Sequence, residues 1–468
     1  MNRTYSQETT SRVGERVRVS GWIASRRDHG KIIFLDLRDE KGVLQVVITP
    51  QATQAHEQAQ LCRQEWVVEI EGMVQARPSS MVQEDSLTGS VELVAETISI
   101  LSPAKTPLFA LDTPGYEIGE EKRLTYRYLD LRRGRLQKNI RERSRIINFF
   151  RQKLLDLGFV EIETPLLTKS TPEGARDFLV PSRLSPGTFY ALPQSPQQYK
   201  QLLQVAGFER YFQLARALRD EDPRGDRQAE HTQLDVEMSF IEKEDVLQLI
   251  ETLYQGVVKT LFPQKHIPQT PFPRITYKEA MKQYGTDKPD LRKNKEDNNE
   301  LAFVFVTDFP AFEWDEKRER WDATHNPFSR SQAKTPEELK ANPGAILSHQ
   351  YDLALNGLEV AGGSLRAYQS DMLQAGFEVM GYSEKQVQEQ FGHMIEAFTY
   401  GVPPHGGFAG GVDRLCAILL EEPNIREVMA FPKTGDNREL MMGAPDHVSE
   451  EQLKELHISV QKDQKTNP

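Results

Sequence analysis

Cysteine is scarce in this sequence, which excludes two ways of holding a chain together. Only Cys62 and Cys416 occur among the 468 residues, and they lie far apart. Two isolated cysteines supply neither a disulfide framework nor a structural zinc site, and they are typical of buried thiols in a reducing compartment. We therefore expect both thiols to be buried and free.

Long apolar runs are absent as well. The N-terminal residues, MNRTYSQETT, contain no apolar signal region, and no apolar run approaches the length that spans a membrane. Internal repeats and the phosphate-binding pattern GxxxxGK(S/T) are also missing. These absences predict a soluble, cytoplasmic chain without a membrane partner.

Positive charge is in deficit overall but is concentrated in one place. The 58 Lys and Arg residues against 69 Asp and Glu give a formal net charge of -11, which by itself argues against a nucleic-acid partner. Residues 122–145, however, contain ten basic residues and two acidic ones, with Tyr126 and Tyr128 among them. Such a patch can hold phosphates in an acidic protein, so it favours RNA contact over a solvated linker and helix face.

The length of 468 residues exceeds what one hydrophobic core supports, so the chain is expected to divide into domains. Residues 13–101 contain five short alternating segments and one helical stretch, separated by glycines and charged turns. That pattern indicates an OB-fold, a β-barrel whose open face commonly binds single-stranded nucleic acid. We expect Trp22 in its core, and we expect Phe34, which follows a basic turn, to stack on an unpaired base.

A strand pair around a charged loop, residues 211–240, organises the rest of the chain. Its return strand has the two-residue period of a half-buried strand, with Leu234, Val236 and Met238 alternating with Gln233, Asp235 and Glu237. On the outgoing strand, small alanines leave open space beside Arg219. The loop between the strands is longer than a tight hairpin turn and carries many charges, which indicates a ligand site.

Two predicted helix starts carry a basic residue where the helix dipole disfavours one. Residues 194–201 begin a helix with Ser195 as its N-cap, and Gln197 and Lys200 project from its first turns. A lysine there is favourable only if an anion neutralises it. In residues 405–421, glycines precede a second helix, and Arg414 in its first turn is likewise suited to a phosphate.

A third segment, residues 351–366, pairs two acids. Asp352 and Glu359 are seven residues apart, so strict alternation would put them on opposite faces of a strand. The Asn356-Gly357 pair between them favours a turn that brings them together again. Two carboxylates suit magnesium, which prefers oxygen ligands. Arg366 supplies a planar fork for bidentate recognition of a carboxylate.

The strand pair resembles motif 2 of the class II aminoacyl-tRNA synthetases, in the aspartyl branch. RDED followed by RQAEHTQLD matches the family pattern fRDED…RQPEFTQ(I/L)D, and residues 407–414 match GxxxGxDR of motif 3. A helix, a strand and a proline in residues 139–165 resemble motif 1. The HIGH and KMSKS signatures of the other synthetase class are absent. The resemblance extends over almost the whole chain.

The resemblance implies an α+β fold, with an N-terminal OB-fold β-barrel that binds the anticodon and a class II catalytic domain. The catalytic domain is expected to be an antiparallel sheet flanked by helices, and motif 1 implies a homodimer. The expected boundaries are residues 1–102 for the barrel, 103–138 for a hinge, 139–457 for the catalytic domain and 458–468 for a disordered tail. Residues 286–300 form only a loop where bacterial relatives insert a sizeable extra domain.

The activity implied by the resemblance is ATP-dependent ligation of L-aspartate to tRNA through aspartyl-adenylate, with Mg²⁺. The implied aspartate-binding residues are Glu173, Ser195, Gln197, Lys200, Arg219, Asp235, His325 and Arg366. The implied ATP-binding residues are Arg219, Asp220, Glu221, Gln228, His231, Glu359, Gly411, Val412, Asp413 and Arg414, of which Arg219 and Arg414 are also the catalytic pair. The implied magnesium ligands are Asp352 and Glu359, and the implied anticodon contacts are Arg27, His29, Phe34 and Gln45.

Two departures from the family pattern fall within the implied site. Ala229-Glu230-His231 replaces Pro-Glu-Phe, so an imidazole with a titratable charge stands where an aromatic ring stacks on adenine. This change predicts weaker ATP binding. Asn326 replaces the second histidine of the family's HHPF sequence, next to His325.

The choice of tRNA is expected to depend on His29. Strictly tRNA(Asp)-specific bacterial enzymes of the family tend to carry Leu at this position, and relatives that charge tRNA(Asp) and tRNA(Asn) tend to carry His. An imidazole donates or accepts according to its tautomer, so it tolerates C or U as the third anticodon base. The alternative is a histidine that only caps the turn.

We therefore predict a non-discriminating ligase, and three other functions are weighed against it. The first is a strictly tRNA(Asp)-specific ligase. The second, an ammonia-dependent asparagine synthetase paralogue, would need no anticodon domain. The third, a non-catalytic RNA-binding relative, should have lost Arg219, Arg414 or the acidic pair, and all of them are present.

Overall fold

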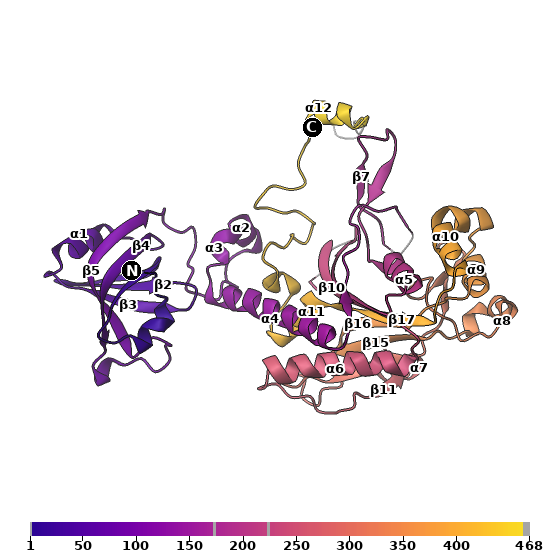
Figure 1. Ribbon diagram of the computed structural model, residues 1–468, viewed down its shortest axis with the longest axis horizontal. Helices are drawn as coiled ribbons and strands as arrows, with labels where there is room; N and C mark the ends of the chain where they lie inside the picture. The colour runs from indigo at the N-terminus through magenta and orange to yellow at the C-terminus, as the bar shows by residue number, and fades with distance from the viewer. Residues whose placement is uncertain (1, 172–174, 222–224, 462–468) are drawn as a thin grey trace. The chain divides into compact units, whose positions relative to one another are not determined.

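The structure is a computed structural model that describes residues 2–171, 175–221 and 225–461 (Figure 1). It divides into two compact units, Met1–Thr113 and Pro114–Pro468. The first unit is a β-barrel and the second is a large, mostly antiparallel sheet with helices, which confirms the expected α+β class. No helix within these described ranges is long and apolar enough to cross a membrane.

The first unit is a closed five-stranded barrel with the strand order β1-β2-β3-β5-β4. Its elements are β1 (Arg16–His29), β2 (Ile32–Arg38), β3 (Val43–Ile48), α1 (Thr53–Leu61), β4 (Val67–Ala76) and β5 (Val91–Ser102), with 3-10 turns at Ser6–Ser11 and Ser79–Met81. Val17, Val19 and Ile23 of β1 point into the core. The expectation that Trp22 lies there is wrong: alternation buries Ile23 and turns Trp22 outward, where it is half-buried.

The second unit is built on an eight-stranded sheet with the order β11-β12-β15-β16-β17-β10-β9-β6. Its strands are β6 (Val160–Glu161), β9 (Arg210–Leu218), β10 (Glu230–Ser239), β11 (Arg274–Thr276), β12 (Phe303–Thr307), β15 (Gln350–Leu355), β16 (Leu358–Leu365) and β17 (His405–Gly411). Among the described strands of this sheet, only the two edge pairs, β11 with β12 and β6 with β9, are parallel. Two ribbons stand outside the sheet, β7–β8 (Leu179–Pro181, Phe189–Ala191) and β13–β14 (Phe312–Asp315, Arg320–Ala323).

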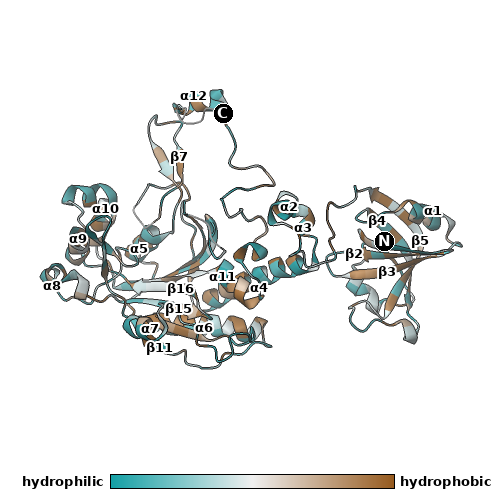
Figure 2. Ribbon diagram, turned by 180° about the vertical axis from the view of Figure 1, so that it is seen from behind, coloured by the Kyte–Doolittle hydropathy of each residue, from teal (hydrophilic) through white to brown (hydrophobic). Residues whose placement is uncertain are grey.

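Three helices cover one face of this sheet with an apolar core, and another helix lies on the opposite face. α4 (Gly134–Asp156), α6 (Lys243–Leu261) and α11 (Val412–Leu419) pack apolar residues against the sheet and form the main core (Figures 1 and 2). α5 (Gln197–Val205) lies on the opposite face beside β10. A separate core joins β13 to α8 (Pro336–Ala341), α9 (Ser370–Val379) and α10 (Glu384–Thr399). The other helical elements are α2 (Glu120–Thr125), α3 (Arg127–Asp130), α7 (Tyr277–Tyr284), α12 (Glu450–Glu455) and 3-10 turns at Pro343–Ala345 and Ile425–Val428.

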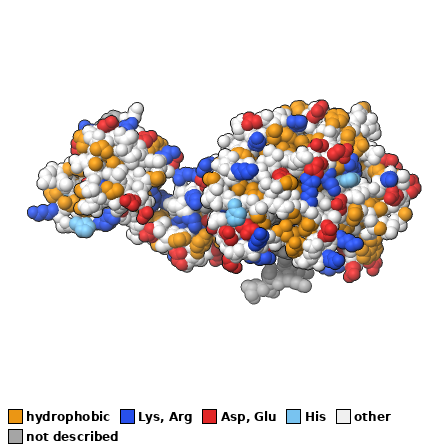
Figure 3. Space-filling model, turned by 90° about the horizontal axis from the view of Figure 1, so that it is seen from below, with side chains coloured by type: hydrophobic (Ala, Val, Ile, Leu, Met, Phe, Trp, Pro, Cys, Tyr) orange, Lys and Arg blue, Asp and Glu red, His pale blue; other side chains and the backbone are white. Residues whose placement is uncertain are grey.

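Three arginines of the basic segment at residues 122–145 are buried, so they are not available to the RNA contact predicted for that segment. Helices α2 and α3 and the start of α4 occupy this part of the expected hinge, and Arg123, Arg127 and Arg133 are buried in it. The three guanidinium groups enclose the Asp130 carboxylate at 3.0, 2.7 and 2.6 Å. Arg123 also pairs with Glu427, so these three guanidinium groups make their bonds within the fold. On the face shown in Figure 3, basic and acidic side chains are interspersed rather than segregated.

Candidate active site

Two adjoining cavities open on the polar face of the sheet. The Lys200 cavity is lined by residues that include Ser195, Gln197, Lys200, Asp235, His325 and Arg366. The Arg414 cavity is lined by residues that include Gln228, His231, Gly411, Asp413 and Arg414. The two cavities share Arg219, Glu221, Gln233 and Glu359, so they form one continuous site.

Strand β10 alternates as predicted, but its polar face is buried rather than exposed. Val236 faces the main core, while Asp235 and Glu237 on the other side are 0% exposed. Helix α5 covers that side, and Lys200 Nζ reaches Asp235 Oδ1 at 2.7 Å and Glu237 Oε2 at 3.3 Å. Burying charges is costly unless they are paired. The polar face is therefore a closed network of charges.

Arg366, which follows β16, completes this network. Its Nε and Nη2 donate to the two carboxylate oxygens of Glu237 at 2.8 and 3.0 Å, and its Nη1 donates to Ser364 Oγ at 2.9 Å. Burial alone would raise the pKa of Glu237, but Arg366 and Lys200 lower this pKa to about 2. Asp235 differs, because burial raises its pKa from the ordinary value despite the charge of Lys200.

The network keeps unused bonding capacity, which indicates a ligand. A guanidinium has five N–H donors, and the contacts of Arg366 leave one on each of Nη1 and Nη2 for an end-on carboxylate. Asp235 Oδ2 is buried with no hydrogen-bond partner among the described residues, since the Tyr211 hydroxyl donates to Gln213 Oε1. A buried, unpaired carboxylate oxygen suits a cation such as an ammonium. The bidentate fork predicted for a substrate is filled by Glu237, so a ligand meets the end of the Arg366 guanidinium.

The two acids of the third segment meet across a hairpin, as the Asn356-Gly357 turn predicts. These two residues join β15 to β16 with φ values of 51° and 86°, the left-handed geometry of a type I′ turn. A Cβ added to Gly362 would lie 2.8 Å from Asp352 Oδ1 and 3.1 Å from Glu359 Oε1, so both carboxylates flank this glycine. Burial and the charge of Glu359 raise the pKa of Asp352 well above its ordinary value. Lys288 Nζ lies 3.7 Å from Glu359, and a divalent ion would neutralise the pair further.

The Arg414 cavity contains cationic and amide groups without partners. Arg219 Nε donates to a backbone carbonyl at 3.4 Å, and no carboxylate within residues 2–171, 175–221 and 225–461 lies within ion-pair distance of it. Arg414 pairs with Asp226 at 3.2 Å, but its Nε and the Nε2 of Gln228 are buried with no partner that the structure describes. Unsatisfied donors of this kind suit an anionic ligand rich in acceptors.

His231 and Asp413 border the Arg414 cavity in states that the sequence did not reveal. Burial, with the charge of Arg219, lowers the pKa of His231 to about 4, so the ring is neutral at pH 7 and the expectation of a titratable charge there is wrong. The Asp413 carboxylate binds Arg143 and the backbone N–H of Thr232, the latter at 2.9 Å. Asp413 thus braces the start of α11.

Three of the described residues predicted for the site, Asp220, Val412 and Asp352, border neither cavity. Asp220 pairs with Arg176 at 3.7 Å instead. Val412 is buried in the main core. Asp352 lies behind the cavity lining, beside Glu359. Glu173 lies outside the described residues.

The first turn of α5 and the loop at His325 complete the Lys200 cavity. The helix begins at Gln197, and Ser195 Oγ accepts a hydrogen bond from the Gln197 N–H at 3.3 Å, so Ser195 bonds to the first turn from one residue farther out than predicted. The His325 ring is exposed to the cavity. The surrounding protein and the charges of Arg366, Arg219 and Lys200 lower the pKa of His325, so the neutral ring can accept or donate.

Two residues that sequence reasoning did not assign share the β10 face of Asp235. Glu237 holds Arg366 and Lys200. Gln233 borders both cavities, and its buried Oε1 has no partner in the described part of the chain. The signal that could have found them is the alternation itself, because it puts positions 233, 235 and 237 on one face.

In the barrel, the four predicted anticodon residues gather on one face. Arg27 and Phe34 are cross-strand partners, and Arg27 Nη2 lies 3.4 Å from Gln45 Oε1. The His29 ring packs edge-on against Phe34 with centroids 5.6 Å apart. β1 extends to His29, so the turn that connects it to β2 consists of residues 30–31 and is shorter than predicted. A cation, an amide and two rings on a barrel face suit single-stranded nucleic acid.

Comparisons with known proteins give matches over both units. The family profile described as tRNA synthetases class II (D, K and N) matches residues 119–435, and the profile described as OB-fold nucleic acid binding domain matches residues 17–101. The chain is 40% identical to an aspartate–tRNA(Asp/Asn) ligase of Rubrobacter xylanophilus, over 98% of this chain and 96% of that protein. It is 39% identical to an aspartate–tRNA ligase of Geobacillus kaustophilus, over 98% of this chain and 99% of that protein.

The lengths of the aligned proteins also differ. The alignment with the Rubrobacter protein runs over 580 positions although this chain has 468 residues, so that relative has more than a hundred residues that this chain lacks. The fold matches a solved asparaginyl-tRNA synthetase of Pyrococcus horikoshii, complexed with asparaginyl-adenylate, with a TM-score of 0.73 and 23% identity. That match covers 93% of this chain and 98% of the other, so the whole fold is shared without a large extra domain.

Proposed function

The chain belongs to the class II tRNA synthetases (D, K and N), and we propose that it joins L-aspartate to tRNA in two steps. In the first step, the aspartate α-carboxylate attacks the α-phosphate of ATP, which gives aspartyl-adenylate and pyrophosphate. In the second step, a terminal ribose hydroxyl of tRNA takes the aspartyl group and AMP leaves. Because the carboxylate nucleophile is already ionised at pH 7, the protein contributes positioning and charge stabilisation.

The observation that carries the choice of aspartate is the buried network around Glu237. Lys200 and the end of Arg366 present positive charge to a side-chain carboxylate, and Asp235 Oδ2 accepts from an α-ammonium. An asparagine amide would direct N–H donors at those cations and leave them unpaired, which is how a polar site rejects an analogue. Further proposed contacts to aspartate are Glu173, Ser195, Gln197, Arg219 and His325.

The Arg414 cavity is proposed to hold ATP. Arg219, which borders both cavities, would contact the α-phosphate and the aspartate carboxylate, and Arg414 the γ-phosphate end. The adenine would then lie against the neutral His231 ring. Asp352 and Glu359 would hold Mg²⁺, which neutralises phosphate charge when bound.

Aspartate-dependent ATP–pyrophosphate exchange tests the first step. The protein should exchange label in the presence of L-aspartate and not of L-asparagine. Equal exchange with both amino acids would contradict the role given to the Lys200 cavity. Exchange without any amino acid, or none at all, would contradict the proposed function itself.

We further propose that the barrel face admits both tRNA(Asp) and tRNA(Asn), as the name of the Rubrobacter relative states for that protein. Charging of a tRNA(Asn) transcript should then be within roughly tenfold of tRNA(Asp), a difference of one good contact. His29→Leu should depress only tRNA(Asn) charging, because leucine offers neither donor nor acceptor. His447→Leu, at an exposed position of the second unit, is the matched control. A wild type that leaves tRNA(Asn) uncharged contradicts this specificity.

We also propose a homodimer formed through α4 and β6, and a cytoplasmic location where tRNA is charged. β6 is a two-residue strand at the edge of the sheet, with Val160 46% exposed, and Leu155 of α4 is 45% exposed. An unpaired sheet edge next to apolar side chains favours association. Sedimentation equilibrium should give twice the chain mass of 53.5 kDa, and a monomer at micromolar concentration would refute the dimer.

A further inference from the structure

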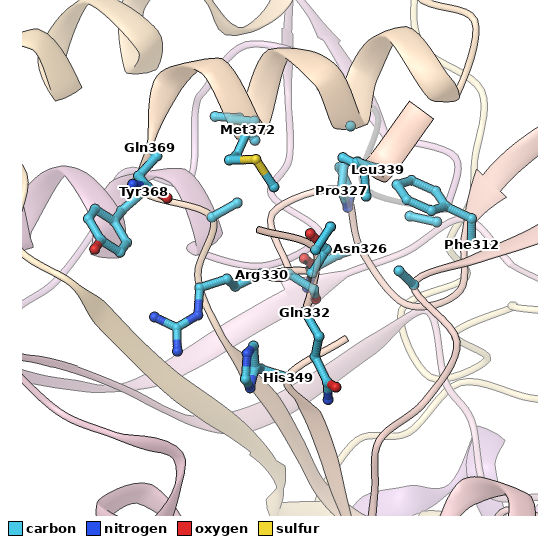
Figure 4. Close-up of a pocket in the computed structure, with 18 residues that line it drawn as sticks. Phe312, Asn326, Pro327, Arg330, Gln332, Leu339, His349, Tyr368, Gln369 and Met372 are labelled. Atoms are coloured by element: carbon cyan, nitrogen blue, oxygen red, sulfur yellow. Dashed lines mark hydrogen bonds between the residues drawn. The ribbon is translucent and has the colours of Figure 1, made fainter. Parts of the chain in front are cut away.

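A second pocket lies in the larger unit, outside the proposed active site. This hairpin pocket is enclosed by the β13–β14 ribbon, residues 326–333 and the start of α9, as Figure 4 shows. Its lining is apolar at Phe312, Leu339, Met372 and Leu373, and polar at Arg330, Gln332, His349 and Tyr368. None of the described residues assigned to aspartate, ATP or magnesium borders it.

Arg330 carries the charge of this pocket, and its guanidinium is without an anionic partner. Within the described residues, no carboxylate lies within ion-pair distance of it. Asp308 is the acid whose charge acts on His349, and it pairs with Lys243 at 3.1 Å and accepts from Gln332 at 3.0 Å. The end of the pocket around Arg330 is therefore positively charged.

The neighbours of Arg330 do not neutralise it. His349 donates its backbone N–H to the Arg330 carbonyl at 2.8 Å, and burial with the Arg330 charge lowers the pKa of His349 to about 4, so its ring is neutral. In Figure 4 the Arg330 guanidinium points to the side of the Tyr368 hydroxyl and away from Phe312. The pocket thus has a cationic end and an apolar end.

We propose that the hairpin pocket is a regulatory site for a small organic monocarboxylate with an apolar body. A planar guanidinium binds a carboxylate through two parallel N–H···O bonds, which would satisfy Arg330. The partly exposed side chains of Pro327 and Met372 would then receive the apolar body. A neutral ligand would leave the Arg330 charge unpaired, and a ligand without an apolar body would leave the other half of the pocket empty.

The hairpin pocket shares a wall with the Lys200 cavity, because Asn326 lines both. The Arg330 N–H donates to the Leu365 carbonyl at 2.8 Å, and the Ser329 hydroxyl bonds to Ser364 Oγ at 3.1 Å. Ser364 Oγ in turn accepts from Arg366. A ligand on Arg330 therefore acts on the support of Arg366 and alters the affinity for aspartate. Thermodynamic linkage makes the effect mutual. This coupling rests on the proposed function, whereas the binding itself does not.

Titration of the full chain with 3-phenylpropionate, followed by ligand-observed NMR, tests the binding. A sulfamoyl analogue of aspartyl-adenylate fills the Lys200 cavity, so that the probe cannot use the carboxylate site there. The acid should bind saturably, and the uncharged 3-phenylpropionamide should not. Arg330→Gln should weaken binding about tenfold or more, and Arg330→Lys, which keeps the charge without the fork, should weaken it less. Arg318→Gln, in the turn between β13 and β14 and with a 64% exposed side chain, should leave binding unchanged.

Three results would overturn the site: equal binding of acid and amide, equal binding to Arg330→Gln, or loss of binding when the analogue is present. The coupling has its own measurement, the KM for aspartate in pyrophosphate exchange. A saturating probe should change this KM about fivefold or more in the wild type and not in Arg330→Gln. A bound probe that leaves the KM unchanged overturns the regulatory role. Absence of exchange would count against the proposed function, because the binding titration requires no catalysis.

Discussion

The two cavities of the site differ in how their charges are satisfied. In the Lys200 cavity, Lys200 and Arg366 pair with Asp235 and Glu237 at 2.7–3.3 Å, and these four side chains are at most 2% exposed. In the Arg414 cavity, Arg219 has no carboxylate partner among the described residues, and buried donors are left without one. The charges of Lys200 and Arg366 are thus balanced before any ligand enters, whereas the charge of Arg219, which borders both cavities, is not.

This difference between paired and unpaired cations matches the different charges of the two proposed ligands, aspartate and ATP. Aspartate must be distinguished from asparagine, and cations that the protein already holds in place distinguish them with little rearrangement. ATP carries several negative charges, and unpaired cations receive them without first giving up a protein partner. Buried donors without partners cost stability until a ligand arrives.

The largest effect is expected from Glu237→Gln, which removes the carboxylate that holds Arg366 and Lys200 without itself lining the cavity. An amide cannot neutralise Arg366, and removing one member of a buried ion pair costs about 3–5 kcal/mol. A loss of that order should appear as a lower free energy of unfolding in urea, together with a KM for aspartate raised by about a hundredfold in pyrophosphate exchange. The KM for ATP should change little, because Lys200 and Arg366, which Glu237 holds, do not border the Arg414 cavity.

Two controls make this result specific to the network. Glu244→Gln removes an exposed carboxylate that pairs with Arg274 and should cost less than about 1 kcal/mol. The double variant Glu237→Gln, Arg366→Leu should be no worse than the more damaged single variant, because the two side chains act as a unit. Wild-type stability and aspartate KM in Glu237→Gln would show that the network is not needed.

The second prediction tests the incomplete cavity. Arg219→Gln should lower kcat of the exchange reaction by about 10²–10³, the effect of losing one preorganised charge-stabilising donor. The free energy of unfolding should change by less than about 0.5 kcal/mol, because no described carboxylate is left unpaired by the change. Arg176→Gln, with a 75% exposed side chain outside both cavities, should leave kcat unchanged. If Arg219→Gln costs several kcal/mol of stability, the two cavities do not differ as described.

Sequence patterns predicted only part of the structure of the two cavities. The alternation along β10 and the turn at Asn356-Gly357 were predicted correctly, because strand period and turn geometry depend on neighbouring residues. Whether solvent reaches the polar face of β10 depends on α5, which covers that face. The sequence alone did not predict that α5 packs against β10. The same limit applies to residues 122–145, where Arg123 is paired with Glu427, far along the chain.

Residue types also do not show which side chains pair with one another through hydrogen bonds and charges. The sequence identified Arg366 as a carboxylate-binding residue, but it could not show that Glu237 already fills the side of its guanidinium. It likewise gave His231 a titratable ring, whereas burial lowers the pKa to about 4. Such facts depend on distances and on exclusion of water, which are properties of the assembled fold.

The smallest expected effect concerns His231, and it separates ring packing from ring charge in the Arg414 cavity. Because the neutral imidazole offers adenine a smaller apolar surface than a phenyl ring, His231→Phe should lower the KM for ATP by roughly two- to tenfold. In the wild type, the folded protein keeps His231 neutral down to about pH 4, whereas the unfolded chain protonates it below about pH 6.5. Its contribution to stability is therefore present above pH 6.5 and is lost as the pH falls toward 4. The stability of His231→Phe relative to the wild type should rise as the pH falls from 7 to 5, as urea titrations at these two pH values would measure. A KM for ATP that rises in His231→Phe would mean that the imidazole makes a specific hydrogen bond to the nucleotide.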